Sequence, residues 1–140
     1  LDTTTTLDGA EAGAFDQAIT KADPAMLMMS LATYQSIDPN NPAVFSSTII
    51  DGHIRNVLKY TGVVISDSMS AEALSNYDVS QLGVNLVEAG GDMSCIGQTD
   101  YVKPIVDGLN ERAKSDPAFA SKVTAAATRV MTLKIKMGLA

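Results

Sequence analysis

Short apolar strands alternate with amphipathic helical segments along this chain, and this alternation constrains the possible fold most strongly. Apolar runs at residues 25–29 and 63–65, and a third within "DMSCI" at 92–96, are too short to be helices and are typical of buried strands. Apolar residues at helical spacing fill the segments between and after these runs. Strands separated by helices predict a parallel sheet with helical crossovers, which places the chain in the α/β class.

One predicted helical segment precedes the first strand in the sequence, and a second follows it. Asp8 is expected to cap one helix and Ser46 or Ser47 the next, which Gly62 should release into the strand at 63–65. The side chains expected to pack against the sheet are Ala10, Ala14, Phe15, Ala18 and Ile19 from the first helix, Ile49, Ile50, Ile54, Val57 and Leu58 from the second, and Met26, Met28 and Met29 from the strand.

Three more helices are predicted in the second half of the chain. Asp78 is expected to start one that ends before Gly90, and a stripe of apolar residues over 102–109 indicates the next. The last should open at Asp116, with Pro117 in its first turn, and close at Gly138. The run "TTTT" at residues 3–6 is interpreted as a solvated tail.

Composition excludes several classes of function. The 140 residues are 46% hydrophobic, enough for one domain with a core, and carry sixteen acidic against ten basic residues, a net charge of −6. Without a basic cluster, neither nucleic acid nor an anionic membrane surface is an expected partner. Cys95 is the single cysteine, which excludes an internal disulfide. No apolar run approaches eighteen residues, so no membrane span is expected.

Asp67 directly follows the strand at 63–65, within "GVVISDSM". The C-terminal edge of a parallel sheet is where catalytic groups collect, because the loops there vary while the strands hold them rigidly. Asp67 could accept a phosphoryl group or act as the nucleophile of a retaining glycosidase. The phosphoacceptor alternative needs an acidic pair after the first strand and a lysine after a later one, and both are absent. A third reading is structural, with Asp67 either capping the short helix that follows or accepting a hydrogen bond within a turn.

Weaker candidates surround Asp67. Ser30 and Tyr34 leave the first strand at the same edge and could face a sugar, although a packed loop residue is the more frequent role for such a tyrosine. Met69 is expected to shape the floor of a sugar subsite. Asp92, at the start of the third strand, is expected to have a structural hydrogen-bonding role.

Several stretches together resemble glycoside hydrolase family 3, in particular its β-N-acetylhexosaminidase branch. The block "ADPAMLMMSLATYQSIDPNNPAVFSSTIIDGHIRNVLKYTGVVISDSM" looks like the strand, loop and "GVV.SD" segment of that family. Downstream, "VEAGGDMSCI" is similar to its "AG.D" strand and "ATRVMTLKIKMGL" to the ending of its catalytic domain. The resemblance covers nearly the whole chain from Phe15 onward.

The resemblance implies a partial (β/α)₈ TIM barrel, with residues 1–140 forming a single partial domain that is the C-terminal half of the barrel. It places the family's nucleophile on Asp67. The family's acid/base is a histidine in a "KHFPGHG"-type motif upstream, and this chain lacks the motif. His53, the lone histidine, lies within a helical segment and is not expected to replace it. At Leu31 many relatives carry a histidine, whose substrate contacts therefore do not carry over.

By the same resemblance, the parent protein is expected to hydrolyse terminal β-linked N-acetylglucosamine, as in peptidoglycan fragments, with retention and without metal or organic cofactor. The relatives suggest an exported or lipid-anchored cell-surface enzyme. The fragment alone is expected to be nearly inactive. Its open sheet edges predict self-association or pairing with the missing N-terminal half. A noncatalytic sugar-binding or scaffold role remains an alternative.

Overall fold

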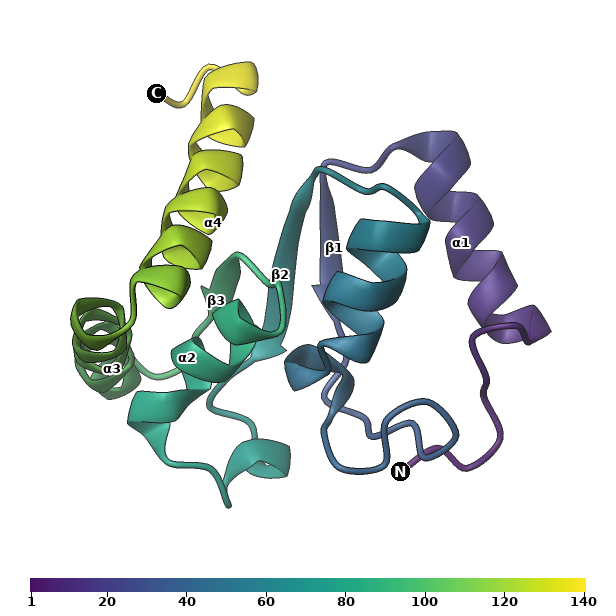
Figure 1. Cartoon of the computed structure of the whole chain (residues 1–140), viewed down its shortest axis with the longest axis horizontal. Coiled ribbons are helices and arrows are strands. Elements are labelled where there is room, and N and C mark those ends of the chain that lie inside the picture. The colour runs from purple at the N-terminus through teal and green to yellow at the C-terminus, as the bar shows by residue number, and fades with distance from the viewer.

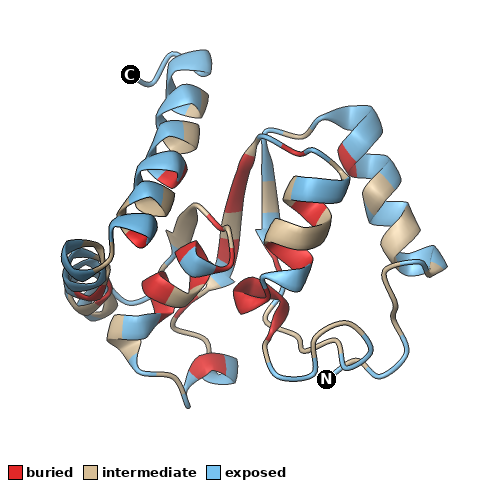
Figure 2. Ribbon diagram, viewed as in Figure 1, coloured by how far each residue is buried: buried red, intermediate tan, exposed pale blue.

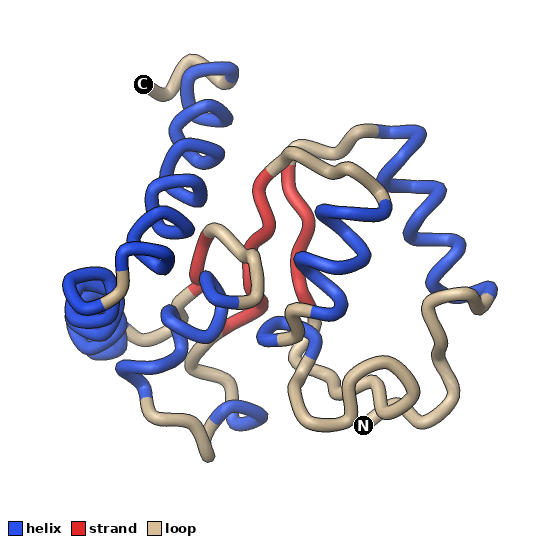
Figure 3. Tube along the Cα trace, in the orientation of Figure 1, coloured by secondary structure: helices blue, strands red, loops and turns tan.

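A three-stranded parallel sheet in the order β1-β2-β3 forms the centre of the computed structural model, which describes residues 1–140 (Figure 1, Figure 3). The strands are β1 (Met26–Met29), β2 (Val63–Ser68) and β3 (Met93–Cys95). The β1–β2 register is regular, with Met26 beside Val63 and Met29 beside Ser66. The predicted α/β class with parallel strands is confirmed.

Helical segments connect the strands, with η2 crossing from β1 to β2 and α2 from β2 to β3. α1 and η2 lie beside β1, whereas α2, α3 and α4 gather near β3, at the opposite edge of the sheet (Figure 1). None of these helices is both long and apolar enough to cross a lipid bilayer. Their bounds are α1 Ala10–Ala22, η1 Ala43–Phe45, η2 Thr48–Val57, η3 Glu72–Leu74, α2 Val79–Glu88, η4 Thr99–Tyr101, α3 Val102–Ser115 and α4 Pro117–Lys136.

The predicted starts of α2 and α4 are confirmed. The Asp78 carboxylate accepts a hydrogen bond from the backbone N–H of Ser80 at 2.8 Å, and Asp116 accepts one from Ala118 at 2.9 Å. These bonds satisfy amide groups that have no partner within the helix. Hydrogen bonds from Ser80 lower the pKa of the Asp78 carboxyl, and those from Phe119 and Ala118 lower the pKa of Asp116.

The second predicted helix is present as η2, but it is wound as a π-helix. Its hydrogen bonds join residues five apart, from Gly52 N–H to the Ser47 carbonyl at 2.8 Å and from Leu58 N–H to the His53 carbonyl at 2.9 Å. π-Helical winding is rare and often occurs near functional sites. Here it sets His53 against α1 and Arg55 against the start of β3.

α1 departs from the prediction at both its cap and its packed face. Gly9, not Asp8, occupies the N-cap position, and no side chain caps the helix. Phe15 was expected in the core but is 73% exposed, and Ile19 is the one buried residue of the helix. The prediction for Phe15 is wrong because α1 contacts the core mainly through Ile19, and a cavity lies between the helix and β1.

The methionines of β1 were expected to fill the core, and this holds only for Met29, which is 7% exposed. Met28 is 70% exposed and Met26 is 37% exposed. Successive side chains of a strand point to opposite faces, so Met26 and Met28 share the face that no helix covers. That prediction is therefore wrong for Met26 and Met28.

Most buried side chains lie where η1, η2 and α2 pack on the sheet, as the colouring by burial indicates (Figure 2). Val44, Ile50 and Val64 are fully buried in this core. A smaller cluster joins α2 to α4 through Val87 and Phe119. The core therefore lies between the sheet and the helices, and the opposite face of the sheet is not covered by other parts of the chain.

The N-terminal segment is not the solvated tail that the sequence predicted. The backbone of Asp2 pairs with the loop after β1, donating to the Thr33 carbonyl and accepting from Gln35 N–H, both at 2.8 Å. The Asp2 carboxylate accepts backbone N–H bonds from Thr5 and Thr4, which lower its pKa. The run of threonines therefore forms a turn that docks on the loop.

Candidate active site

Asp67 lies at the C-terminal end of β2, on the edge of the sheet where the sequence predicted a functional carboxylate. The neighbouring residues Val64 and Ser66 are fully buried, whereas Asp67 is exposed. Its Oδ1 accepts one hydrogen bond, from the backbone N–H of Ser68 at 2.6 Å. A carboxylate held at the end of a rigid strand and open to solvent can serve as a nucleophile or a general base.

Asp67 does not cap the helical turn that follows it. η3 begins at Glu72, and its N-cap residue is Ala71, which contributes no side-chain capping bond. The capping role considered from the sequence is therefore wrong. The carboxylate makes no hydrogen bond beyond the one to Ser68, so most of its acceptor capacity is available to a ligand.

Strand geometry determines the face on which Asp67 lies. The β1–β2 register pairs Met28 with Ile65, so these two side chains point to the same face. Ser66 pairs with the buried Met29 and is itself fully buried, whereas the next residue, Asp67, is exposed, so we assign Asp67 to the open face that Ile65 and Met28 share. Because Met28 is 70% exposed, this face has no cover within the chain. It is the face that would point inward if the sheet were closed into a barrel with helices outside.

Ser30 leaves β1 at the same edge of the sheet at which β2 carries Asp67. Met29 pairs with Ser66, and Ser30 and Asp67 are the next residue on each strand. Ser30 is exposed, and its Oγ accepts a backbone N–H two residues further on at 3.0 Å. Tyr34 is half-buried against the core. That these two residues contact a sugar stays a prediction.

Met69 is part of the core, with 1% of its surface exposed. Its backbone N–H donates to the carbonyl of Cys95 at 2.8 Å, which ties the chain just after Asp67 to β3. Met69 therefore lies beneath the edge that carries Asp67. Its predicted place in the floor of a sugar subsite stays a prediction.

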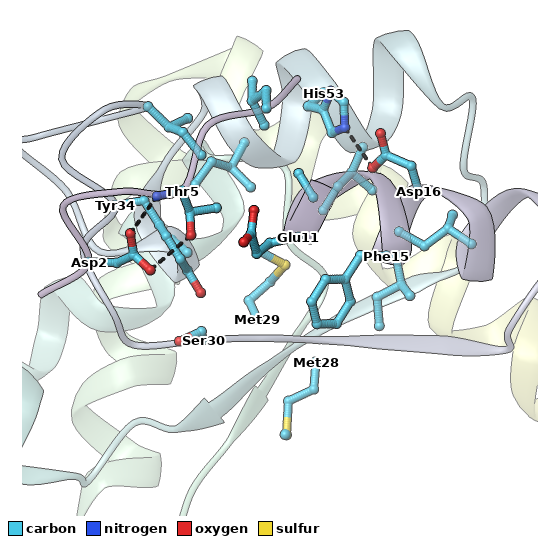
Figure 4. A pocket seen from close by; sticks show the side chains of 18 residues that line it. Asp2, Thr5, Glu11, Phe15, Asp16, Met28, Met29, Ser30, Tyr34 and His53 are labelled. Atoms are coloured by element: carbon cyan, nitrogen blue, oxygen red, sulfur yellow. Dashed lines mark hydrogen bonds and ion pairs between the residues drawn. The ribbon is translucent and has the colours of Figure 1, made fainter. Parts of the chain in front are cut away.

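A cavity of about 330 Å³ lies between α1 and β1 (Figure 4). Most of its lining is hydrophobic, and Phe15 from α1 approaches Met29 from β1 within it. Ser30 and Tyr34 lie at its polar end. Asp67 does not line this cavity, so the cavity and the Asp67 edge are separate features that meet near Ser30.

His53 is occupied by a partner on α1. Its Nε2 lies 2.8 Å from Oδ1 of Asp16, and the two side chains are only 13% and 27% exposed (Figure 4). This contact joins η2 to α1 on the helix side of the sheet. His53 thus lies on the helix side of the sheet, and that it is not the acid/base stays a prediction.

Asp92 is the centre of a buried ion-pair network at the N-terminal end of β3. Its side chain has no exposed surface and accepts from Arg55 at 2.5 Å and from Arg129 Nε at 2.7 Å. A third bond comes from the backbone N–H of Val64 at 2.8 Å. This geometry gives Asp92 the structural role that the sequence predicted and joins η2, β2, β3 and α4.

The two arginines of this network were not singled out from the sequence as partners of Asp92. Arg55 also donates to the carbonyls of Tyr60 and Gly62 at 3.1 and 2.7 Å. Burial lowers the pKa of the Arg55 guanidinium, and the charge of Asp92 opposes this shift. Arg129 belongs to the stretch "ATRVMTLKIKMGL", so the resemblance to the family was the only feature of the sequence that drew attention to it.

No group of three or more histidine, cysteine, aspartate or glutamate side chains is gathered closely enough to hold a metal ion.

The comparison with family models matches residues 2–133 to "Glycosyl hydrolase family 3 N terminal domain". No curated protein sequence matches the chain. Among solved structures, a β-N-acetylhexosaminidase from Beutenbergia cavernae is similar, with 34% sequence identity and a TM-score of 0.87 over 95% of this chain. A glycoside hydrolase family 3 β-N-acetylglucosaminidase from Paenibacillus has 27% identity and a TM-score of 0.85 over 98% of the chain.

A β-N-acetylglucosaminidase from Thermotoga maritima is also similar, with 25% identity and a TM-score of 0.75 over 85% of this chain. The matched region is only part of each relative. It covers 40% of the Beutenbergia chain, 26% of the Paenibacillus chain and 27% of the Thermotoga chain.

Proposed function

We propose, since this chain belongs to glycosyl hydrolase family 3, that it supplies the nucleophile of a retaining glycosidase acting on terminal β-linked N-acetylglucosamine. The observation that carries this proposal is the position of Asp67. It is an exposed carboxylate with a single hydrogen bond, fixed at the C-terminal end of a strand whose preceding residues are buried. The names of the similar solved structures support the choice of sugar.

In the proposed reaction, an Asp67 carboxylate oxygen attacks the anomeric carbon as the bond to the leaving oxygen breaks. A glycosyl ester forms on Asp67, and water then hydrolyses it, so that two inversions give net retention. The leaving oxygen takes a proton from an acid/base group. His53 does not fit that role because it is paired with Asp16 on the helix side of the sheet.

By the family resemblance, the acid/base is a histidine in an upstream motif that these 140 residues lack, and we propose that the complete enzyme contains this chain together with that motif. Protonation of a leaving group typically contributes about 10²- to 10⁴-fold to the rate. The chain alone should accordingly turn over natural substrates very slowly. The resemblance to exported, lipid-anchored members supports cell-wall fragments as the substrate and the cell surface as the location.

The same proposal makes the chain the C-terminal half of a (β/α)₈ barrel. β1 and β3 each have a strand partner on only one side, and such edges tend to pair with a further strand. Phe15 and Met28 expose apolar surface next to the open edge of β1. A preceding strand and helix would fill the cavity between α1 and β1 and cover these side chains.

Solution behaviour tests the half-barrel proposal. The 140-residue chain alone should self-associate or melt with low cooperativity, and adding the N-terminal half of the complete enzyme should give a one-to-one complex with a sharper transition. Light scattering and calorimetry measure both. A monodisperse monomer with a cooperative melt would count against the proposal.

Stereochemistry and rescue test the nucleophile. The complete enzyme should release N-acetylglucosamine first as the β-anomer, followed by NMR before mutarotation. Asp67→Ala should lose turnover, and azide should restore cleavage of an activated substrate, giving the α-glycosyl azide because only one inversion then occurs. Asp92→Asn is the matched control and should give no α-glycosyl azide, because its nucleophile is intact and any azide that intercepts the glycosyl enzyme gives the β-anomer. A β-azide from Asp67→Ala, or undiminished hydrolysis by it, would remove Asp67 from the role.

A further inference from the structure

The sheet is irregular at the position of Asp67. On its β1 side, β2 follows a residue-by-residue register through Ser66. On its β3 side, Ile65 pairs with Met93 but Ser68 pairs with Cys95, so three steps along β2 correspond to two along β3. A β-bulge of this kind bends the strand and re-aims a side chain. Asp67 lies within the bulged stretch.

A side-chain hydrogen bond and a backbone hydrogen bond together span this bulge. The N–H of Cys95 donates to Oγ of Ser66 at 2.9 Å. The carbonyl of the same residue accepts from Met69 N–H at 2.8 Å. The Cys95 peptide therefore holds β2 on both sides of Asp67, through the residue before it and the second residue after it.

Ser66 is suited to this contact by its burial. It is fully buried, as is Ser46, and these are the only two polar residues of the buried core. A hydroxyl in such a place needs a hydrogen-bond partner, and the Cys95 amide provides one. An alanine at residue 66 would fit the space but leave the bulge without its side-chain acceptor.

We propose that Ser66 is a positioning residue for Asp67, acting through its hydrogen bond to the Cys95 amide. This role rests on the proposed function of Asp67 as nucleophile. The Ser66 hydroxyl fixes the bulge, and the bulge sets the direction in which the carboxylate leaves the edge of the sheet. Misplacing a catalytic group by about 1 Å can cost about 10²-fold in rate.

The test compares Ser66→Ala with Ser46→Ala in the complete enzyme. Ser46 is the matched control because its hydroxyl is equally buried but donates to Asp38 at 2.7 Å and makes no hydrogen bond to β2 or β3. Ser66→Ala should lower kcat and the rate of covalent labelling at Asp67 by about 10- to 100-fold, with KM changed less than about threefold. Ser66→Thr, which keeps the hydroxyl, should recover most of the loss.

Three outcomes would overturn the proposal: a labelling rate for Ser66→Ala within about twofold of wild type, an equal loss in Ser46→Ala, or no recovery in a folded Ser66→Thr. Hydrogen exchange gives a readout that is independent of activity, because the Cys95 amide should exchange faster in Ser66→Ala and not in Ser46→Ala. If wild-type enzyme is not labelled at Asp67 at all, the proposed function fails, whereas the amide exchange still reports whether Ser66 closes the bulge.

Discussion

Two aspartates at opposite ends of the sheet have opposite surroundings. Asp67, at the C-terminal end of β2, is exposed and accepts one hydrogen bond from its neighbour in the chain. Asp92, at the N-terminal end of β3, has a side chain with no exposed surface that accepts from Arg55, Arg129 and the backbone. The carboxylate at the C-terminal end therefore has free acceptor sites, whereas the one at the N-terminal end has its acceptor sites occupied by protein groups.

This difference indicates a division of work between the two ends of the sheet. A carboxylate whose acceptor sites are filled by two arginines and a backbone amide has little capacity left for a substrate, and its removal would leave a buried guanidinium without a counter-charge. A carboxylate with free acceptor sites at the edge contributes little to folding and is available for chemistry. In parallel barrels the C-terminal ends of strands carry catalytic residues, and the N-terminal ends carry residues that stabilise.

The largest expected effect is on catalysis. Asp67→Asn in the complete enzyme should lower kcat by about 10⁴-fold or more, because the amide cannot form the glycosyl ester. The midpoint of thermal unfolding should stay within about 2 °C of wild type, since an exposed side chain is replaced by one of equal size. Steady-state kinetics and calorimetry measure the two quantities. A large loss of stability would contradict the division between the two ends.

The next effect concerns stability. Asp92→Asn should destabilise the fold by about 3–5 kcal/mol, because it leaves the buried guanidinium of Arg55 without its counter-charge. Denaturant unfolding of the complete enzyme measures this change. Below the unfolding temperature of the variant, kcat should stay near that of wild type. A stable but inactive Asp92→Asn variant would mean that Asp92 takes part in catalysis, which contradicts its assignment as a stabilising residue.

A smaller loss is expected at the exposed side of the network. Arg129→Ala should cost about 1.5–3 kcal/mol, because Asp92 keeps its bonds to Arg55 and to Val64 N–H. Arg129→Lys should recover only part of this loss, since a lysine ammonium does not reproduce the planar guanidinium. Unfolding in urea checks both variants. If Arg129→Ala costs as much as Asp92→Asn, α4 is held mainly by this single contact.

The smallest predicted effect is a loss of stability at low pH. Burial raises the pKa of Asp38, but hydrogen bonds from Ser46, Asn41 and Asn40 outweigh it and hold the pKa below its ordinary value. A carboxyl with a lowered folded pKa stabilises the fold above its unfolded pKa, about 3.9, and loses this contribution as pH falls through the folded value.

The midpoint of unfolding should therefore fall as pH drops below about 4, and Asp38→Asn should lessen that fall by about 1–3 °C. Melting curves at a series of pH values measure the difference. An identical pH dependence in the variant would mean that the Asp38 hydrogen bonds do not form in solution.

Much of the fold could be predicted because its signals are local. The three strands, the caps Asp78 and Asp116, and the position of Asp67 follow from short runs of apolar residues and their flanking residues. These patterns act over fewer than ten residues, within reach of periodicity arguments. The parallel order then follows from the helices that separate the strands.

Features that depend on distant contacts were missed. Arg55 and Arg129 each lie 37 residues from Asp92 in sequence, and no local pattern joins them. The bulge beside Asp67 depends on the register with β3, which the sequence of β2 alone does not specify. Phe15 and Met28 were placed in the core because they are apolar, but within this chain they are 73% and 70% exposed.

The measurement that tests the central claim most directly is the intact mass of the complete enzyme after reaction with a fluorinated N-acetylglucosaminide that carries an activated leaving group. The fluorine slows hydrolysis of the glycosyl enzyme, so the intermediate accumulates. We predict a mass gain of one sugar, mapped by peptide analysis to Asp67, present in Asp92→Asn and absent in Asp67→Asn. A sugar attached to any other residue, or an adduct that persists in Asp67→Asn, would contradict the assignment of Asp67 as the nucleophile.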